Sequence, residues 1–291
     1  MAQDCPKVKR SPNPSPASSL DTQDNPPDRL YVLECLEKHG RIVDILCEGL
    51  MGCWREPPYV YCFFDRVPSD LAISHLEAKG FHVTGRYDLS YGQWQRLPNQ
   101  LLHIGPFQIL FTSQDTHNLP LHALSIVLRP GLVFGSGMHP TTRLCLKLLA
   151  QVYVSESMRT VVDVGTGTGI LAMAAARLGA RRVLALDVNP LAVEEAGANV
   201  RRNGLDQKIL LVIAAGLEAV GPFGELLLVN LEWPSLRVFL QKDGWKRFRW
   251  IICSGYFESQ AETLKSMFLG THSPEGYLVQ EDWAASFWRR T

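Results

Sequence analysis

The sequence predicts an α/β protein in which a doubly wound parallel sheet follows a smaller N-terminal α+β domain. From residue 155 onward, short apolar segments alternate with segments of helical spacing, the pattern of strand–helix units in a parallel sheet. Before residue 112, strand-like and helix-like segments are short and mixed, as in small α+β domains. A chain of 291 residues is long enough for both domains.

The composition argues against several classes of protein. Lys and Arg total 29, and Asp and Glu total 29, so no net charge draws the chain to nucleic acid or to an anionic membrane. The sequence has no apolar stretch of roughly 18 residues, and no apolar segment follows the first basic residues as in a secretory signal. The seven cysteines lack the spacing of a zinc site, and their odd number favours reduced thiols. We therefore expect a cytoplasmic protein without a metal.

Residues 1–28 differ from the rest of the chain. They contain six prolines and few large apolar side chains, so burial cannot offset the entropy that ordering would cost. We expect a disordered tail there, to which no function can be assigned. Residues 29–118 form the expected α+β domain. Its expected elements are an apolar segment at 29–36, a helix at 42–50, a strand at Tyr59–Phe64, a helix at 69–79 that ends at Gly80, and a strand at Phe107–Phe111.

Residues 119–291 form the expected sheet domain, and each predicted helix in it is followed by a glycine or joins two apolar strands. The carboxyl ends of the strands are where such sheets bind ligands. The expected elements are a helical run at 143–150, strands at 161–164, 183–187, Ile209–Ile213, Leu226–Asn230 and 250–253, and helices at Ile170–Leu178 and 190–203.

The segment V-V-D-V-G-T-G-T-G-I at 161–170 joins a predicted strand to a predicted helix. Its glycines do not fit the G-x-G-x-x-G pattern of dinucleotide sites, because Ile170 stands where the third glycine would be. Asp163 precedes the glycines, and a carboxylate there repels a pyrophosphate but attracts a cation. Asp187 ends the next strand and can accept hydrogen bonds from both hydroxyls of a ribose. These features favour S-adenosylmethionine, which carries an ammonium, a sulfonium and no phosphate. A nicotinamide site or a structural turn is the alternative.

A second motif, P-G-L-V-F-G-S-G-M-H-P-T-T, occupies residues 130–142. It resembles the F-G-T-G-x-H-P-T-T signature of the PrmA-like ribosomal-protein lysine methyltransferases, which are class I S-adenosylmethionine-dependent enzymes. The resemblance continues through D-V-G-T-G-T-G-I-L-A, L-D-V-N-P-L-A and L-L-V-N-L, and covers roughly residues 120–291. It implies a class I (Rossmann-like) methyltransferase domain behind a substrate-recognition domain. It also adds residues of the second motif to the site. The expected cofactor-binding residues are Phe134, His139, Thr142, Asp163, Gly165, Thr166, Gly167, Asp187 and Asn230. The alternative for the second motif is a turn in which Thr141 or Thr142 caps the following helix.

Asn230 and Glu232 are the expected catalytic residues. Asn230 ends a predicted strand, and its amide oxygen can accept a hydrogen bond from a nucleophilic amine, which would aim the nitrogen lone pair at the methyl group. The following residues depart from the family, because this chain has Glu232 and Trp233 there. Glu232 can attract a lysine and accept its proton, or it can be a solvated loop acid. Trp233 can line the acceptor pocket or pack in the core. A second departure is at 214–216, where many methyltransferases have an acid that contacts the adenine amine; its absence leaves backbone groups and Leu217 for adenine.

The expected function is methyl transfer from S-adenosylmethionine to a lysine amine of a protein. The resemblance points first to trimethylation of a large-subunit ribosomal protein. Three alternatives stay open: another protein substrate such as an electron-transfer flavoprotein subunit, a nucleic acid, and a catalytically inactive module that keeps the cofactor fold. We expect a monomer that binds a protein substrate and neither nucleic acid nor membrane.

Overall fold

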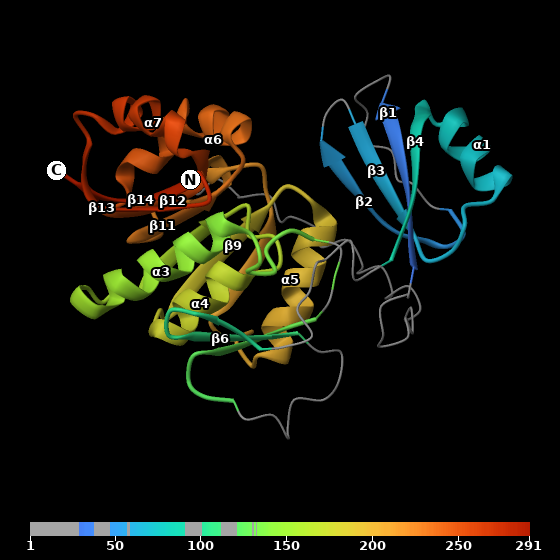
Figure 1. Ribbon diagram of the computed structural model, residues 1–291. Coiled ribbons are helices and arrows are strands. Elements are labelled where there is room, and N and C mark those ends of the chain that lie inside the picture. The colour runs from blue at the N-terminus through green and yellow to red at the C-terminus, as the bar shows by residue number, and fades with distance from the viewer. Residues whose placement is uncertain are drawn as a thin grey trace, which may run out of the picture.

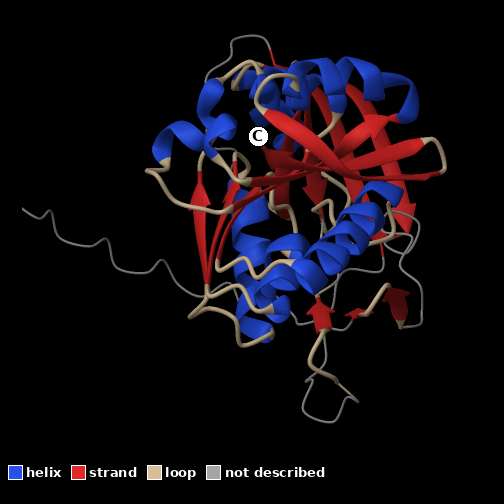
Figure 2. Ribbon diagram, turned by 90° about the vertical axis from the view of Figure 1, so that its left-hand side faces the viewer, coloured by secondary structure: helices blue, strands red, loops and turns tan. Residues whose placement is uncertain are grey.

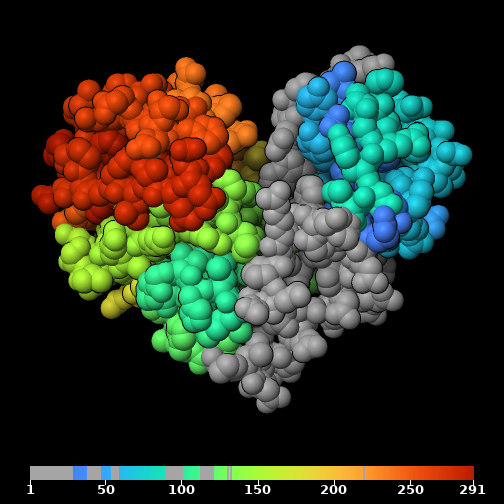
Figure 3. Space-filling model, viewed as in Figure 1, coloured from blue at the N-terminus to red at the C-terminus, as the bar shows by residue number. Residues whose placement is uncertain are grey.

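The computed structural model of the protein describes residues 29–37, 47–56, 59–90, 101–111, 121–129, 131 and 133–291. Figure 1 shows a small N-terminal unit, in blue to cyan, beside a larger layered unit that runs from green to red. The space-filling view in Figure 3 shows the same two units. The expected tail at 1–28 lies outside the described residues.

The N-terminal unit is an antiparallel sheet with one helix on it. Its strands are β1 (Arg29–Glu37), β2 (Leu50–Glu56), β3 (Tyr59–Phe64) and β4 (Phe81–Ser90), in the order β2-β3-β1-β4, and α1 (Asp70–Ala78) packs on one face. The hydroxyl oxygen of Ser69 accepts a hydrogen bond from the backbone N–H of Ala72 and so caps α1. Of the helix expected at 42–50, residues 42–46 lie outside the described part, and the rest is a turn that leads into β2.

A three-stranded sheet follows, made of β5 (Leu102–Ile104), β6 (Phe107–Phe111) and β7 (Ser125–Leu128) in that order. β6 runs parallel to β7, and Phe107, Ile109 and Ile126 are buried in the same core as the helices of the larger unit. The domain boundary expected at residue 118 would therefore cut through this sheet. We propose instead that the boundary between the two units lies between residues 90 and 102.

The larger unit contains a seven-stranded sheet in the order β10-β9-β8-β11-β12-β14-β13. Strands β8 to β12 run parallel to one another, as the alternating sequence pattern predicts, but β14 is antiparallel to β12 and to β13. The sheet is thus mixed rather than wholly parallel, because the last two strands form a hairpin that needs no crossover helix. The strands are β8 (Thr160–Val164), β9 (Arg182–Asp187), β10 (Ile209–Ile213), β11 (Leu226–Asn230), β12 (Trp250–Phe257), β13 (His272–Gln280) and β14 (Trp283–Arg290).

Helices cover both faces of this sheet, as Figures 1 and 2 show. Val161 and Val162 illustrate the consequence: both are completely buried, but they belong to different cores on opposite faces. A strand covered on both sides reads as a continuous apolar run. On one face lie α3 (Pro140–Ser155), α4 (Ile170–Leu178) and α5 (Pro190–Arg202), and on the other lie α6 (Trp233–Leu240) and α7 (Ala261–Phe268), with short 3-10 turns η1 (Leu217–Ala219), η2 (Asp243–Arg247) and η3 (Glu258–Gln260) between elements.

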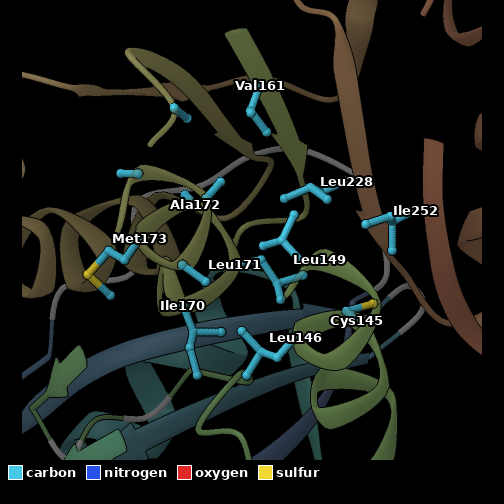
Figure 4. Packing of buried hydrophobic residues seen from close by; sticks show 14 of the residues in the cluster. Cys145, Leu146, Leu149, Val161, Ile170, Leu171, Ala172, Met173, Leu228 and Ile252 are labelled. Carbon is cyan, nitrogen blue, oxygen red and sulfur yellow. The ribbon is translucent and has the colours of Figure 1, made fainter. Parts of the chain in front are cut away.

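The core under α3 and α4 fixes the position of the loops at the strand ends. Figure 4 shows Ile170 and Leu171 of α4 and Leu149 of α3 packed near Leu228 of β11 and Ile252 of β12. Because β8, β9 and β11 are parallel neighbours, their carboxyl ends meet at one edge of the sheet. Chain order changes direction between β8 and β11, which is where doubly wound sheets bind ligands.

Candidate active site

A cavity of about 1090 Å³ opens at the carboxyl ends of β8, β9 and β11. Two walls enclose it. The first, which we call the loop wall, consists of the turns that follow these strands together with residues 133–139. The second, the helix wall, consists of η1, α6 and η2. The cavity is large enough for a cofactor-sized ligand.

The loop wall begins with the glycine turn after β8. Gly165 and Gly167 have φ angles of +72° and +56°, a region that favours glycine. The backbone N–H groups of Gly165 and Thr166 donate to the carbonyl oxygen of Leu186, both at 2.9 Å. A side chain at Gly165 would collide with Leu231, and one at Gly167 would collide with the carbonyl oxygen of Phe134. At Gly167, where the neighbour is a backbone atom, only glycine therefore permits this close approach.

Asp187 lies at the end of β9 and lines the cavity. Its carboxylate accepts hydrogen bonds from the N–H of Gly167 at 3.0 Å and of Asn189 at 2.9 Å. Burial raises its pKa, and these backbone donors oppose that shift. The carboxylate thus joins the glycine turn to the turn after β9, at the surface of the cavity.

Asp163 and Thr166 lie behind the loop wall rather than on the cavity surface. Asp163 is 1% exposed, and the Thr166 hydroxyl donates to its Oδ2 at 2.7 Å. Its other oxygen, Oδ1, is buried and has no hydrogen-bond partner among the described residues. Burial raises the pKa of this carboxyl to about 7. The structure does not place this group where it would touch a ligand in the cavity.

The segment before α3 is attached to the glycine turn. The N–H and the hydroxyl of Thr168 donate to the carbonyl oxygens of Phe134 and Gly135 at 3.1 and 2.7 Å. The alternative for this motif, in which Thr141 or Thr142 caps α3, is wrong. His139 is the N-cap, and its Nδ1 accepts a hydrogen bond from the N–H of Thr141.

His139 also belongs to an aromatic contact at one end of the cavity. Its ring centroid lies 5.3 Å from that of Phe134 and 4.7 Å from that of Trp283 of β14, both in edge-on geometry. Burial lowers the pKa of His139. The ring is therefore neutral at pH 7, which agrees with an Nδ1 that accepts hydrogen bonds. Sequence reasoning missed Trp283, because it comes from a distant hairpin.

Asn230 and Glu232 both line the cavity at the end of β11. Asn230 Nδ2 donates to the Thr142 hydroxyl at 3.5 Å, the long end of a hydrogen bond, which leaves the amide oxygen for a ligand. Glu232 is exposed and accepts a hydrogen bond from the Ser235 hydroxyl at 3.3 Å. Trp233 lies outside the cavity lining and packs toward Tyr256, with ring centroids 6.4 Å apart.

The sequence indicates the backbone at 214–216 and Leu217 beside the helix wall, but not the charged and aromatic groups of that wall. Backbone and small side chains at 214–216 follow β10, and Glu218 of η1 forms an ion pair of 2.6 Å with Lys242 after α6. Phe239 and Trp245 add apolar surface. No motif marks these residues, because three separate segments contribute them.

Of the predicted site residues, seven line the cavity and three stand behind it. Phe134, His139, Gly165, Gly167, Asp187, Asn230 and Glu232 line it, whereas Thr142, Asp163 and Thr166 support the lining. Among the described residues, no group of His, Cys, Asp or Glu side chains is arranged to hold a metal ion. Within the same part of the chain, no helix is long and apolar enough to cross a membrane.

Comparisons with known proteins agree with this geometry. A curated relative from Colwellia psychrerythraea, named ribosomal protein L11 methyltransferase, is 35% identical over 173 residues, which is 55% of this chain and 54% of the relative. A protein of the same name from Exiguobacterium sp. is 35% identical over 191 residues, covering 64% and 58%. The chain thus spans little more than half the length of these relatives.

A crystal structure of ribosomal protein L11 methylase from Lactobacillus delbrueckii subsp. bulgaricus has a TM-score of 0.57 and 28% identity, covering 66% of this chain and 98% of that one. The fold is that of a class I methyltransferase. The family model described as ribosomal protein L11 methyltransferase (PrmA) matches residues 102–291, which are 190 of the 291 residues. With a glycine turn, an acid after β9 and an asparagine after β11 around one cavity, the chain belongs to the PrmA family.

Proposed function

We propose that this protein transfers methyl groups from S-adenosylmethionine to a lysine amine of a protein, with a large-subunit ribosomal protein as the first substrate to test. The position of Asn230 carries the proposal. Its amide lines the same cavity as Asp187 and the glycine turn, and its Nδ2 is directed toward Thr142. An amide oxygen held in this way can accept a hydrogen bond from an amine.

The residues present fit the cofactor. Gly165 and Gly167 present backbone to the cavity, and Asp187 presents a carboxylate for the ribose hydroxyls. Val188 and the segment 214–217 offer an apolar and backbone surface for adenine. The bound cofactor supplies a methyl group on a positively charged sulfur. We propose that Asp163, Thr142 and Thr166 act by holding the lining residues in place.

The chain's own residues would position the amine and remove its proton. A lysine amine has an ordinary pKa near 10.4, so it must lose a proton before it can act as a nucleophile. Desolvation in the cavity lowers that pKa, and the exposed carboxylate of Glu232 at the rim can attract the cation and take the proton. Asn230 then orients the nitrogen at about 3–3.5 Å from the methyl carbon.

The N-terminal unit is the proposed recognition domain for the protein substrate, and we propose a monomer that acts in the cytoplasm. A nucleic-acid substrate is disfavoured by equal numbers of acidic and basic residues, 29 of each. A catalytically inactive module and a different protein substrate are outcomes of the experiment below.

The first experiment is calorimetric titration of the purified chain with S-adenosylmethionine, using Asp187→Ala and Asn230→Ala. We expect Asp187→Ala to weaken binding by about 10- to 100-fold, because charged hydrogen bonds are worth about 1.5–3 kcal/mol. Asn230→Ala should keep the affinity within a few-fold and lose methyl transfer. Turnover near the wild-type rate in Asn230→Ala would refute its assigned role.

The second experiment measures label transfer from S-adenosylmethionine to purified ribosomal protein L11, the substrate in the names of the relatives. Labelled lysine, located by mass spectrometry, would support the proposal. Cofactor binding with label in another protein of a cell lysate would keep the reaction and replace the substrate. Binding without any transfer would favour the inactive module.

A further inference from the structure

Four cysteines gather in the N-terminal unit, away from the cavity, and three of them lie on its strands, whereas Cys47 precedes β2. Cys35 lies on β1, Cys53 on β2 and Cys62 on β3, and none of them forms a disulfide. The Sγ atoms of Cys53 and Cys62 are 3.5 Å apart. Cys62 also interacts with Cys35, since β3 lies between β1 and β2. The proposed methyl transfer uses none of these thiols.

Strand register determines which two of the thiols can join. Cys53 and Cys62 are directly opposite each other in the antiparallel β2–β3 pair. Opposite residues have Cα atoms about 4.5–5.5 Å apart, inside the range of about 4.4–6.8 Å that a disulfide spans. The residue opposite Cys35 on β3 is Val60, so Cys35 and Cys62 are diagonal neighbours, at about 7–8 Å. That separation is too long for a disulfide without backbone movement.

The two opposed thiols differ in access to solvent. Cys62 is completely buried, and hydrogen bonds with Cys35 and Cys53, together with burial, raise its thiol pKa. Cys53 is only partly buried. Of these two thiols, a dissolved oxidant therefore meets Cys53 first, and the Cys62 sulfur lies 3.5 Å from the sulfur at which the product forms.

We propose that Cys53 and Cys62 are a reversible oxidation site at which a peroxide forms an intramolecular disulfide. The Cys53 thiolate attacks one peroxide oxygen and breaks the O–O bond, which gives a sulfenic acid and a hydroxide that takes up the thiol proton as water. The sulfur of Cys62 then attacks the sulfenic sulfur, the S–S bond forms, and water leaves with the Cys62 proton. With hydrogen peroxide, two thiols are oxidised and the peroxide is reduced to two waters. A small thiol reverses the reaction by exchange.

The disulfide would form beside the contact between the two units. Gly52 precedes Cys53, and a side chain on Gly52 would lie 2.7 Å from Leu191 of α5. α5 begins directly after the turn that contains Asp187 and Asn189. Oxidation would add a covalent link between β3 and β2, the strand that contacts the larger unit. The site stands independently of the proposed methyl transfer.

The experiment treats the full-length chain with hydrogen peroxide, blocks the remaining thiols by alkylation, and maps peptides by mass spectrometry without reduction. We expect a cross-linked Cys53–Cys62 peptide, loss of both thiols from the alkylated set, and recovery of both after dithiothreitol. Cys53→Ser should abolish the cross-link. Cys35→Ser is the matched control, because it removes a neighbouring thiol and should leave the cross-link intact.

Three results would overturn the proposal. Both thiols could stay alkylatable after peroxide, Cys53 could go on to sulfinic acid without cross-linking, or the disulfide could join Cys35 instead. Far-ultraviolet circular dichroism of each variant shows that it is folded, and Cys62→Ala serves as a second variant that should also lack the cross-link.

Discussion

The two walls of the cavity are built in different ways. The loop wall consists of tight turns in which glycines with positive φ, backbone hydrogen bonds and buried carboxylates leave little freedom. The helix wall presents side chains from η1, α6 and η2, and its ion pair between Glu218 and Lys242 is more than half exposed on both sides. Substitutions in the loop wall should therefore have large effects, and substitutions in the helix wall should have small ones.

The largest effect on cofactor binding is expected for Gly167→Ala. A Cβ at this position would collide with the Phe134 carbonyl oxygen, and φ is +56°. We expect loss of detectable S-adenosylmethionine binding and a decrease of about 1–3 kcal/mol in the free energy of unfolding. Calorimetric titration and denaturant unfolding measure the two effects. Gly204→Ala is the matched control, because φ is +64° and no atom lies within 4 Å. Equal behaviour of the two variants would show that backbone strain, not the collision, matters.

The next effect concerns the pH dependence of stability at Asp163. Burial raises its pKa from 3.8 to about 7, so the folded state holds this proton more tightly than the unfolded state. The resulting stability is complete below the unfolded pKa and is lost as the pH rises through about 7. Relative to Asp163→Asn, the ligand-free wild type should lose up to about 4 kcal/mol between about pH 4 and pH 8.

Denaturant unfolding of both proteins across that pH range measures the difference. The Asn variant keeps an acceptor for the Thr166 hydroxyl but cannot titrate, so this residue should contribute no pH dependence to its free energy of unfolding. A wild-type curve that runs parallel to the variant curve would mean that Asp163 titrates normally.

The smallest effect is expected in the helix wall. Glu218→Gln removes the charge that pairs with Lys242 at 2.6 Å, on an exposed surface where such pairs contribute little. We expect the affinity for S-adenosylmethionine to change by less than about fivefold. Lys242→Met should behave alike. Calorimetric titration of these variants alongside Asp187→Ala tests the comparison. A loss of affinity as large as in Asp187→Ala would show that the helix wall contributes as much to binding as the loop wall.

The same contrast explains what the sequence could predict. The glycine turn, Asp187 and Asn230 lie in or beside strand ends, where local spacing determines their position, so their place at one edge of the sheet follows from the strand–helix pattern. Glu218, Lys242 and Trp283 reach the cavity through tertiary packing, and no local pattern marks them. The mixed end of the sheet was missed for a related reason, since the hairpin of β13 and β14 has no crossover helix.

The packing differs from one predicted contact and from one alternative for the second motif. Asp163 precedes the glycines, and its charge suggested a direct contact with a cation, but its side chain is buried beneath the turn with Thr166. His139 rather than a threonine caps α3, because the imidazole nitrogen reaches the first free N–H of the helix. The direction of a side chain at a strand end depends on how the neighbouring loop folds, and the sequence pattern does not show that fold.

The hydrogen bonds of Thr168 have a practical consequence for protein engineering. Through its N–H and hydroxyl, this one residue joins the segment of Phe134 and Gly135 to the glycine turn, more than thirty positions away in the chain. A chimaera that takes residues 133–142 from a relative but keeps its own residues 165–169 would combine two segments that are hydrogen-bonded to each other in this structure. Both segments should therefore come from the same protein. In recombination the two motifs should be exchanged together, and chimaeras with a crossover point between them should fold poorly.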